Sequence, residues 1–138
     1  MENCIFCKII KGEIPSYTVY EDDYFKAILD IAPSSSGHTI MIAKCHAENL
    51  LELPDEFCEN ALKIAKKLGG AIMKGTKADG FNILQNNGAA AWQSVSHFHI
   101  HIIPRSNDDG VLLPSKTLSP SKEEFEAVLV EIKKEIEK

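Results

Sequence analysis

The feature that most constrains this chain is a run in which histidines alternate with apolar residues: His97-Phe98-His99-Ile100-His101-Ile102-Ile103. Successive side chains of a β-strand point to opposite faces of the sheet. The three imidazoles therefore share one face, with neighbours roughly 6.6 Å apart along the strand. The apolar residues between them form an uninterrupted opposite face. The pattern predicts a strand that covers a core on one side and carries a cluster of titratable groups, typical of a functional site, on the other.

Two kinds of chemistry fit this row of histidines. The imidazoles could track the phosphates of a ligand, or divide between separate sites. Alternatively, they could form a metal tripod, because His-x-His on a strand is a common zinc-binding arrangement. The spacing alone does not separate these interpretations.

The remaining pattern predicts an α+β fold. Short β-prone runs over 16–21 and 25–29 flank an acidic turn and indicate a hairpin, and strands are expected over 38–43, 81–85 and 97–103, the last stopping at Pro104. Apolar residues at spacings of three and four predict a helix over 55–74, with Pro54 near its start, and a second helix opens at Ser119-Pro120. The strand and helix order lacks regular alternation, so we expect an antiparallel sheet of about five strands with one long central helix and a C-terminal helix.

Length and charge limit the classes of function. A chain of 138 residues is about one domain long, which gives a single domain over 1–138. The formal net charge of −5 argues against binding long nucleic acids, although one pocket of oriented donors could still hold a small nucleotide. Neither a bilayer-spanning apolar run nor a signal peptide is evident, so we expect a cytoplasmic protein without membrane association. In that reducing compartment, the four cysteines favour metal ligation or buried thiols over disulfides.

The histidine run resembles the signature of the histidine triad (HIT) family, in which three histidines alternate with apolar residues. Gln93-Ser94-Val95 is similar to that family's approach to the triad. Upstream, three segments are similar to the N-terminal half of that family: Cys4-Ile5-Phe6-Cys7-Lys8-Ile9-Ile10, Leu29-Asp30-Ile31-Ala32-Pro33 and Gly37-His38. The resemblance covers about residues 4–105, which implies a HIT-like fold with a C-terminal extension and helix over about 106–138.

The resemblance implies hydrolysis at the α-phosphate of a purine nucleotide. A neutral imidazole is a competent nucleophile at physiological pH. The middle histidine, His99, would form a covalent nucleotide intermediate that water then hydrolyses. His101 would hydrogen-bond the α-phosphate, and His38 would orient the other histidines.

The resemblance also implies which residues bind the nucleotide. Ser94, Asn86 and Gln93 would donate to phosphate oxygens, since phosphoryl transfer depends on positioning and charge stabilisation. Asp30 would accept from the ribose hydroxyls. Each of these residues also fits an ordinary turn or cap, and plain core packing fits the apolar residues expected around the base equally well: Ile5, Phe6, Ile9 and Ile31.

A structural zinc site is the implied cofactor. Cys4-x-x-Cys7 is a plausible pair of thiolate ligands. In family members with this motif, a histidine after the third strand and the first triad histidine complete the set, which gives His46 and His97 here. A Cys₂His₂ set closes a tetrahedron and leaves no open position, so the metal would be structural. This would leave His99 and His101 for chemistry, and Cys45 and Cys58 as small apolar residues.

The chain departs from the family at Trp92, where a Gly commonly precedes Gln-Ser-Val, so a large side chain stands beside the phosphate loop. The C-terminal helix resembles the bacterial-type branch. The third histidine, in place of Gln, favours the hydrolase branches over the galactose-phosphate nucleotidyltransferase branch.

Three hypotheses follow. The first is an enzyme that cleaves a nucleoside phosphoramidate, an acyl-nucleotide or a dinucleoside polyphosphate. The second is a nucleotide- or partner-binding module with incidental turnover, and the third is a zinc enzyme that uses all three histidines around one metal. Family members pair through the long helix and a neighbouring strand, so we expect a homodimer.

Overall fold

Five strands form one antiparallel sheet in the structure, a computed structural model that describes residues 3–111 and 118–138. The spatial order of the strands is β1-β2-β3-β5-β4. Their bounds are β1 Thr18–Glu21, β2 Phe25–Leu29, β3 Thr39–Ala43, β4 Gly80–Leu84 and β5 His99–Arg105. The predicted α+β class with a five-stranded antiparallel sheet is therefore confirmed.

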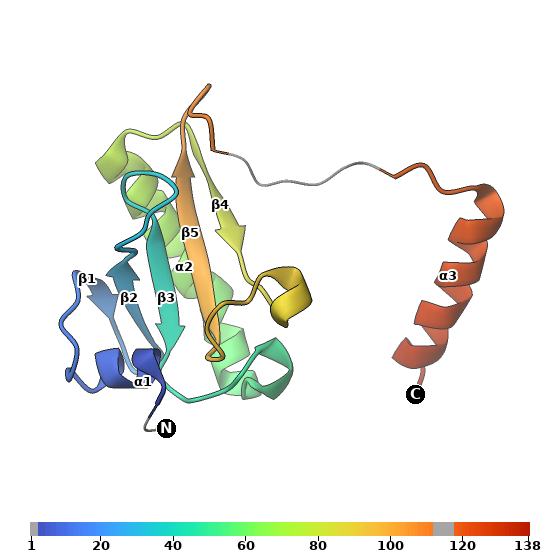
Figure 1. Cartoon of the computed structure of the whole chain (residues 1–138), viewed down its shortest axis with the longest axis horizontal. Helices are drawn as coiled ribbons and strands as arrows, with labels where there is room; N and C mark the ends of the chain where they lie inside the picture. The colour runs from blue at the N-terminus through green and yellow to red at the C-terminus, as the bar shows by residue number, and fades with distance from the viewer. Residues whose placement is uncertain (1–2, 112–117) are drawn as a thin grey trace.

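The helices occupy three different places around this sheet (Figure 1). Their bounds are α1 Ile5–Ile10, α2 Asp55–Thr76 and α3 Lys122–Ile136, with short 3-10 turns η1 at Leu50–Glu52 and η2 at Ala89–Ala91. The long helix predicted over 55–74 continues to Thr76, where Lys77 ends it in the left-handed conformation with φ 58°.

One face of the sheet packs on α2 and forms the main core. Phe98, Ile100 and Ile102 lie in this core, as the alternation of the histidine run predicts. Helix and sheet approach closely at Gly69, where an added Cβ would come within 2.5 Å of the Phe81 ring. A side chain at this position would therefore push α2 away from β4.

The opposite face of the sheet packs on α1. Phe6 and Ile9 of α1 form a second cluster with Ile28, Ile40 and Ile42. Ile40 pairs with His101 and Ile42 pairs with His99, and residues directly opposite in an antiparallel pair share a face. The histidines of β5 therefore lie on the same side of the sheet as α1.

The structure corrects two details of the sequence interpretation. The last strand runs over His99–Arg105 rather than 97–103, so it passes through Pro104. Pairing of β5 with β3 extends only to Ile102, and beyond it β4 is the one neighbour. A proline is tolerated there because one edge of the strand has no ladder to interrupt.

The second correction is α1, which the sequence interpretation did not predict as a helix. It has only six residues and begins after Cys4, whose thiol accepts a hydrogen bond from the Cys7 N–H at 3.4 Å. A thiol is not among the side chains that usually announce a helix start, and six residues are too few to show helical periodicity.

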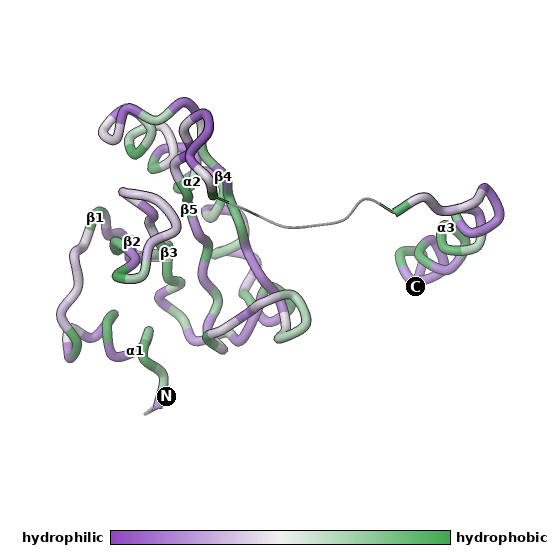
Figure 2. Tube along the Cα trace, turned by 45° about the horizontal axis from the view of Figure 1, so that its top comes forward, coloured by the Kyte–Doolittle hydropathy of each residue, from purple (hydrophilic) through white to green (hydrophobic). Residues whose placement is uncertain are grey.

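α3 stands apart from the sheet and begins with a capping box between Ser121 and Glu124 (Figure 1). Hydrophobic and hydrophilic residues are interspersed along it (Figure 2). All of its residues are exposed. No helix within 3–111 or 118–138 is both long and apolar enough to cross a membrane.

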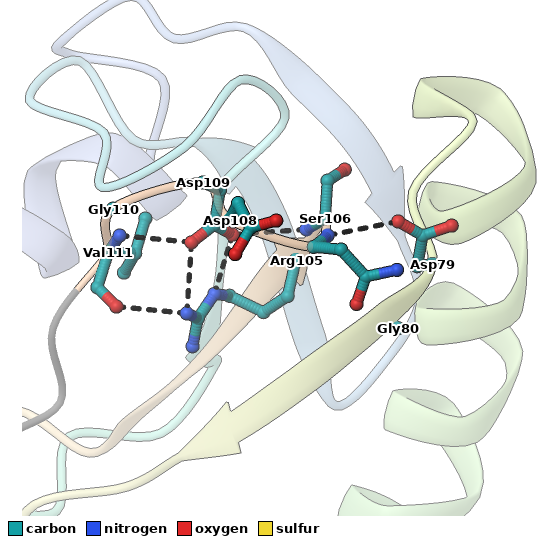
Figure 3. Close-up of a pocket in the computed structure, with 9 residues that line it drawn as sticks. Asp79, Gly80, Arg105, Ser106, Asp108, Asp109, Gly110 and Val111 are labelled. Carbon is teal, nitrogen blue, oxygen red and sulfur yellow. Dashed lines mark hydrogen bonds and ion pairs between the residues drawn. The ribbon is translucent and has the colours of Figure 1, made fainter.

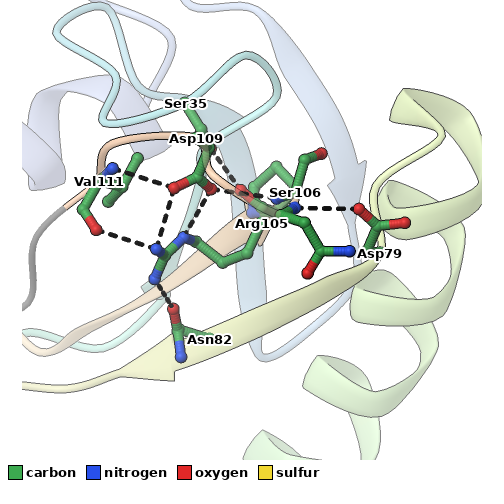
Figure 4. A network of polar contacts seen from close by, with 9 residues as sticks. Ser35, Asp79, Asn82, Arg105, Ser106, Asp109 and Val111 are labelled. Carbon is green, nitrogen blue, oxygen red and sulfur yellow. Dashed lines mark hydrogen bonds and ion pairs between the residues drawn. The ribbon is translucent and has the colours of Figure 1, made fainter.

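A polar network fixes the chain where it leaves β5 (Figures 3 and 4). The Arg105 guanidinium donates to both carboxylate oxygens of Asp109, at 2.8 and 3.0 Å, and to Asn82 Oδ1 at 2.8 Å. The ion pair holds the pKa of Asp109 well below its usual range. Arg105 and Asp109 border an open pocket of about 710 Å³ between Asp79 and Val111, which none of the histidines lines.

Candidate functional site

His99 and His101 line a pocket of about 280 Å³ on the α1 side of the sheet. Its walls come from α1, the 14–17 segment, β2 and the two residues after it, β3, and the loop that precedes β5. Most of the side chains predicted to bind a nucleotide meet here: Ile5, Phe6, Ile9, Asp30, Ile31, Ser94, His99 and His101. The structure therefore brings together residues that lie up to 96 positions apart in the sequence, from Ile5 to His101.

Asn86 and Gln93 do not line this pocket. The Asn86 side chain donates to the Trp92 carbonyl at 3.3 Å. The Gln93 side chain accepts from the Gly88 N–H at 2.8 Å and donates to the backbone carbonyls of Glu48 and Val95. Both amides therefore hold the loop before β5 in shape, and their predicted contact with phosphate stays a prediction.

The sequence interpretation missed part of the pocket wall. Ile28 and Ile40 belong to it because the strand register places them on the face of His101. The turn after α1 and nearby positions supply the rest of the missed lining: Ile14, Pro15, Ser16, Tyr17, Leu29 and Val95. Strand register was the signal that could have found the isoleucines, but nothing in the sequence indicated which way the 14–17 segment folds.

His99 is held in one orientation by the backbone. Its Nδ1 lies 2.7 Å from the His97 carbonyl oxygen, and only 5% of the residue is exposed. A carbonyl can only accept, so Nδ1 carries the proton and Nε2 has a free lone pair in the neutral ring. No hydrogen bond within the described residues engages Nε2, and the ring lines the pocket.

A chain of hydrogen bonds fixes the tautomers of His38 and His101. The backbone N–H of Ser34 donates to His38 Nδ1 at 3.0 Å, so the proton of neutral His38 is on Nε2. His38 Nε2 lies 2.9 Å from His101 Nδ1, which must then accept. The proton of His101 is thereby on Nε2, where it can be donated to a ligand. Asp30 Oδ2 lies 3.6 Å from His38 Nε2 and supports the same orientation.

Burial keeps these imidazoles neutral. Loss of hydration lowers the pKa of His38, of His99 and of His101, and the pKa of His101 falls to about 4 because the adjacent His99 and His38 add to the effect. A neutral His99 and a neutral His101 are the forms that can attack and donate, respectively.

The lowered pKa of His101 predicts that stability falls in acid. Its ordinary pKa is 6.5 and the folded value is about 4, so between these pH values the unfolded chain binds more protons. Stability from this group is complete above pH 6.5 and declines as the pH falls to 4, by up to about 3 kcal/mol. Urea unfolding from pH 7 to pH 4 measures the decline. His101→Gln should show a shallower slope, and identical slopes would contradict this assignment.

Four potential metal ligands converge beside the pocket. Cys4 Sγ, Cys7 Sγ, His46 Nδ1 and His97 Nδ1 all lie within 4.8 Å of one another. The closest pairs are 3.2 Å for Cys4 and His97, 3.3 Å for Cys7 and His46, and 3.2 Å for the two imidazoles. Tetrahedral zinc with ordinary bond lengths separates its ligands by about 3.3–3.8 Å. The set therefore has the composition and the dimensions to hold a metal ion.

The hydrogen bond of the His97 side chain also suits a histidine that binds a metal. His97 Nε2 lies 2.7 Å from the Ala43 carbonyl oxygen and must donate to it, which leaves a lone pair on Nδ1. That lone pair points at the His46 nitrogen and at two sulfur atoms. A cation bound among these atoms would be coordinated by the lone pairs that otherwise face one another. A hydrogen bond from the second ring nitrogen to a carbonyl is the usual support of a zinc-bound histidine.

The hypothesis of three histidines around one metal does not fit this geometry. His97 Nδ1 faces the cysteines, whereas His99 and His101 face the pocket. Asp30, His38 and His101 also lie close enough together to share a metal, but hydrogen bonding already explains their proximity. The histidine row therefore divides between two sites.

Trp92 has a backbone conformation that favours glycine. Its φ is 69°, and its side chain is 60% exposed. Glycine adopts this left-handed conformation without the steric cost that a Cβ brings. The tryptophan ring is not part of the histidine pocket lining.

We expect Trp92→Gly to raise the free energy of unfolding by about 0.5–1 kcal/mol. Relief of the left-handed conformation outweighs the greater flexibility of glycine in the unfolded chain. Urea denaturation is the measurement. Ala91→Gly is the matched control, since Ala91 has no positive φ and its replacement should lower stability by a similar amount. A less stable Trp92→Gly protein would mean that packing of the indole ring dominates.

The fold and site define a small α+β protein with a histidine pocket next to a Cys₂His₂ cluster. The family model described as the HIT domain matches residues 11–108, and the chain belongs to the HIT family. Adenosine 5'-monophosphoramidase hnt1 of Schizosaccharomyces pombe is 45% identical over 137 residues, which cover 97% of this chain and 98% of that protein.

Two solved structures share this architecture. The crystal structure of SMU.412c from Streptococcus mutans UA159 has a TM-score of 0.93 at 40% identity, and the match covers 99% of this chain and 87% of that one. A zinc-bound histidine triad family protein from Mycobacterium smegmatis has a TM-score of 0.77 at 34% identity, with 96% of this chain and 97% of that one covered.

Proposed function

We propose that this protein is a nucleotide hydrolase that cleaves the bond between the α-phosphate of a purine nucleotide and its leaving group through a covalent intermediate on His99. The observation that carries the proposal is the orientation of His99: Nδ1 is bonded to the His97 carbonyl at 2.7 Å, and the free Nε2 belongs to a ring that lines the pocket. The monophosphoramidase name of the fission yeast relative supports this class of reaction.

The reaction proceeds in two displacements at phosphorus. The His99 Nε2 lone pair attacks the α-phosphorus, a P–N bond forms, and the bond from phosphorus to the leaving amine or phosphate breaks as the leaving group takes up a proton from the solvent. The ring becomes cationic, and the His97 carbonyl stabilises its Nδ1–H. A water then attacks phosphorus and releases one proton to the solvent, the P–N bond breaks, and the nucleoside monophosphate departs with His99 neutral again.

Other pocket residues bind the nucleotide. His101 donates from Nε2 to an α-phosphate oxygen or to the leaving group, in the tautomer that His38 fixes. Asp30 accepts from the ribose hydroxyls, and Ser94 donates to phosphate. The base lies among the apolar side chains Ile5, Phe6, Ile9 and Ile31.

Turnover of two substrates tests this proposal. Purified protein is assayed with adenosine 5′-phosphoramidate and with a diadenosine polyphosphate, and AMP release is measured. We expect release from at least one of them, and the preferred substrate identifies the branch. AMP binding without turnover of either substrate would favour the nucleotide-binding module instead.

We further propose zinc as the metal of the Cys₂His₂ cluster. Two thiolates and two imidazoles around a closed tetrahedron are typical of structural zinc, and the mycobacterial relative is described as zinc-bound. Cys4 and Cys7 at α1, His46 after β3 and His97 before β5 would hold the zinc, which would crosslink these three segments. Metal analysis of the purified protein should give one zinc per chain.

A homodimer through α2 and β4 is the proposed assembly. β4 is an edge strand, so one row of its backbone groups is free to pair. Leu62 of α2 and Ile83 of β4 are exposed hydrophobic side chains on these elements. Sedimentation equilibrium is expected to give twice the mass of one chain, and a monomer would exclude this assembly.

A further inference from the structure

α1 belongs to both sites at once. Cys4 caps its N-terminus and Cys7 lies within it, so its first turn carries two of the four cluster ligands. Three other α1 side chains line the histidine pocket: Ile5, Phe6 and Ile9. The helix is therefore both a support of the cluster and a wall of the pocket.

Phe6 connects the two sites through packing. Its ring lies edge-on to His97, with centroids 5.8 Å apart, and to His99, with centroids 5.0 Å apart. Phe6 is itself buried. Displacement of α1 would consequently move the aromatic surface against which the His99 ring rests.

His97 makes a second connection through its backbone. Its side chain contributes Nδ1 to the cluster, while its carbonyl oxygen accepts the hydrogen bond from His99 Nδ1 at 2.7 Å. One residue thus ties the cluster to the group that sets the tautomer and direction of His99. His97 precedes the first residue of β5, so strand pairing alone does not fix this carbonyl.

We propose that the Cys4, Cys7, His46 and His97 cluster positions the nucleotide site, because its metal holds α1 and the His97 carbonyl against His99. This inference rests on the proposed metal and nucleotide functions and extends them. The four ligands are positioning residues: they control the pocket wall and the His99 ring without touching the substrate.

The short length of α1 explains why loss of the metal would affect the pocket before it affects the sheet. A six-residue helix has little stability of its own and persists through its tertiary contacts. The apolar cluster of Phe6 and Ile9 supplies part of those contacts, and the metal ligands supply others. The sheet and α2 pack through a separate core that contains none of the four ligands. Metal loss should loosen α1 while the sheet persists.

His46→Ala is the variant that tests the coupling. His46 is exposed and is a cluster ligand, but it does not line the histidine pocket. Cys45→Ala is the matched control, because Cys45 is the neighbouring residue and lies outside the cluster. For each protein we would measure zinc content, the dissociation constant for AMP by calorimetry, and hydrogen exchange of the backbone amides.

We expect His46→Ala to lose zinc, to bind AMP at least tenfold more weakly, and to exchange the amides of Lys8 and Lys11 faster. Those amides donate to Cys4 and Cys7 carbonyls within α1. Exchange in β2 and β3 should be unchanged, and Cys45→Ala should match wild type throughout. Chelation of wild-type zinc should reproduce the weaker binding, and added zinc should restore it.

The other outcomes separate the coupling from the functions beneath it. Loss of zinc with unchanged AMP affinity and unchanged α1 exchange would overturn the coupling and leave the metal site standing. Wild-type protein that binds AMP but no zinc would overturn the metal site and the coupling together. Wild-type protein that holds zinc but does not bind AMP would overturn the proposed nucleotide function.

Discussion

Replacing His99 with alanine is expected to abolish turnover, with a loss of at least about 10³-fold in kcat. The reason is that Nε2 of His99 is the proposed attacking atom, and His101, the other described histidine that lines the pocket, has its Nδ1 lone pair engaged by His38. AMP affinity should change little, since the apolar walls and Asp30 remain. Initial rates on the preferred substrate, with AMP titration calorimetry alongside, measure the two effects separately.

A chemical rescue distinguishes a nucleophile from a residue that merely packs. In His99→Gly, free imidazole can enter the vacated space and attack phosphorus itself, so added imidazole should restore part of the turnover. When turnover by wild-type enzyme is quenched without acid, the mass of the protein should also be greater by one nucleotidyl group. A His99→Ala protein within tenfold of wild-type kcat would refute the covalent mechanism.

The sequence predicted those parts of the site that depend on short-range periodicity. Strict alternation from His97 to Ile103 sufficed to place Phe98 and Ile100 in the core and His99 on the other face. The same alternation could not say which histidines act together. That division depends on where α1 brings Cys4 and Cys7, a contact across about ninety residues of sequence.

The parts that were missed depend on tertiary context. β5 starts only after His97 because its pairing with β3 begins at His99, which lies opposite Ile42. Asn86 and Gln93 are polar residues in a loop before the triad, and an amide side chain can hydrogen-bond a phosphate oxygen or a backbone group equally well. Only the positions of the Trp92, Gly88, Glu48 and Val95 backbone groups show that both amides contact the backbone, which leaves their contact with phosphate a prediction.

Phe98→Ala is expected to have the largest effect on stability, with a loss of about 3–5 kcal/mol in the free energy of unfolding. Phe98 is only 2% exposed and packs in the core between the sheet and α2, near Phe25. Folded domains are usually stable by about 5–15 kcal/mol, so this single cavity removes a large share of the total. Urea denaturation followed by circular dichroism gives the value, and Phe98→Leu, which keeps most of the apolar volume, should cost clearly less.

The position of Phe98 between His97 and His99 makes this variant informative about the site as well. Its ring faces α2, while the hydrogen bond from His99 Nδ1 to the His97 carbonyl lies on the other side of the sheet. The backbone N–H and carbonyl of Phe98 bond to Ala47 and Ala43, and the substitution keeps both bonds. Molecules that remain folded at low temperature should therefore keep AMP affinity within tenfold of wild type. A collapse of AMP binding in fully folded Phe98→Ala protein would show instead that core packing sets the His99 geometry directly.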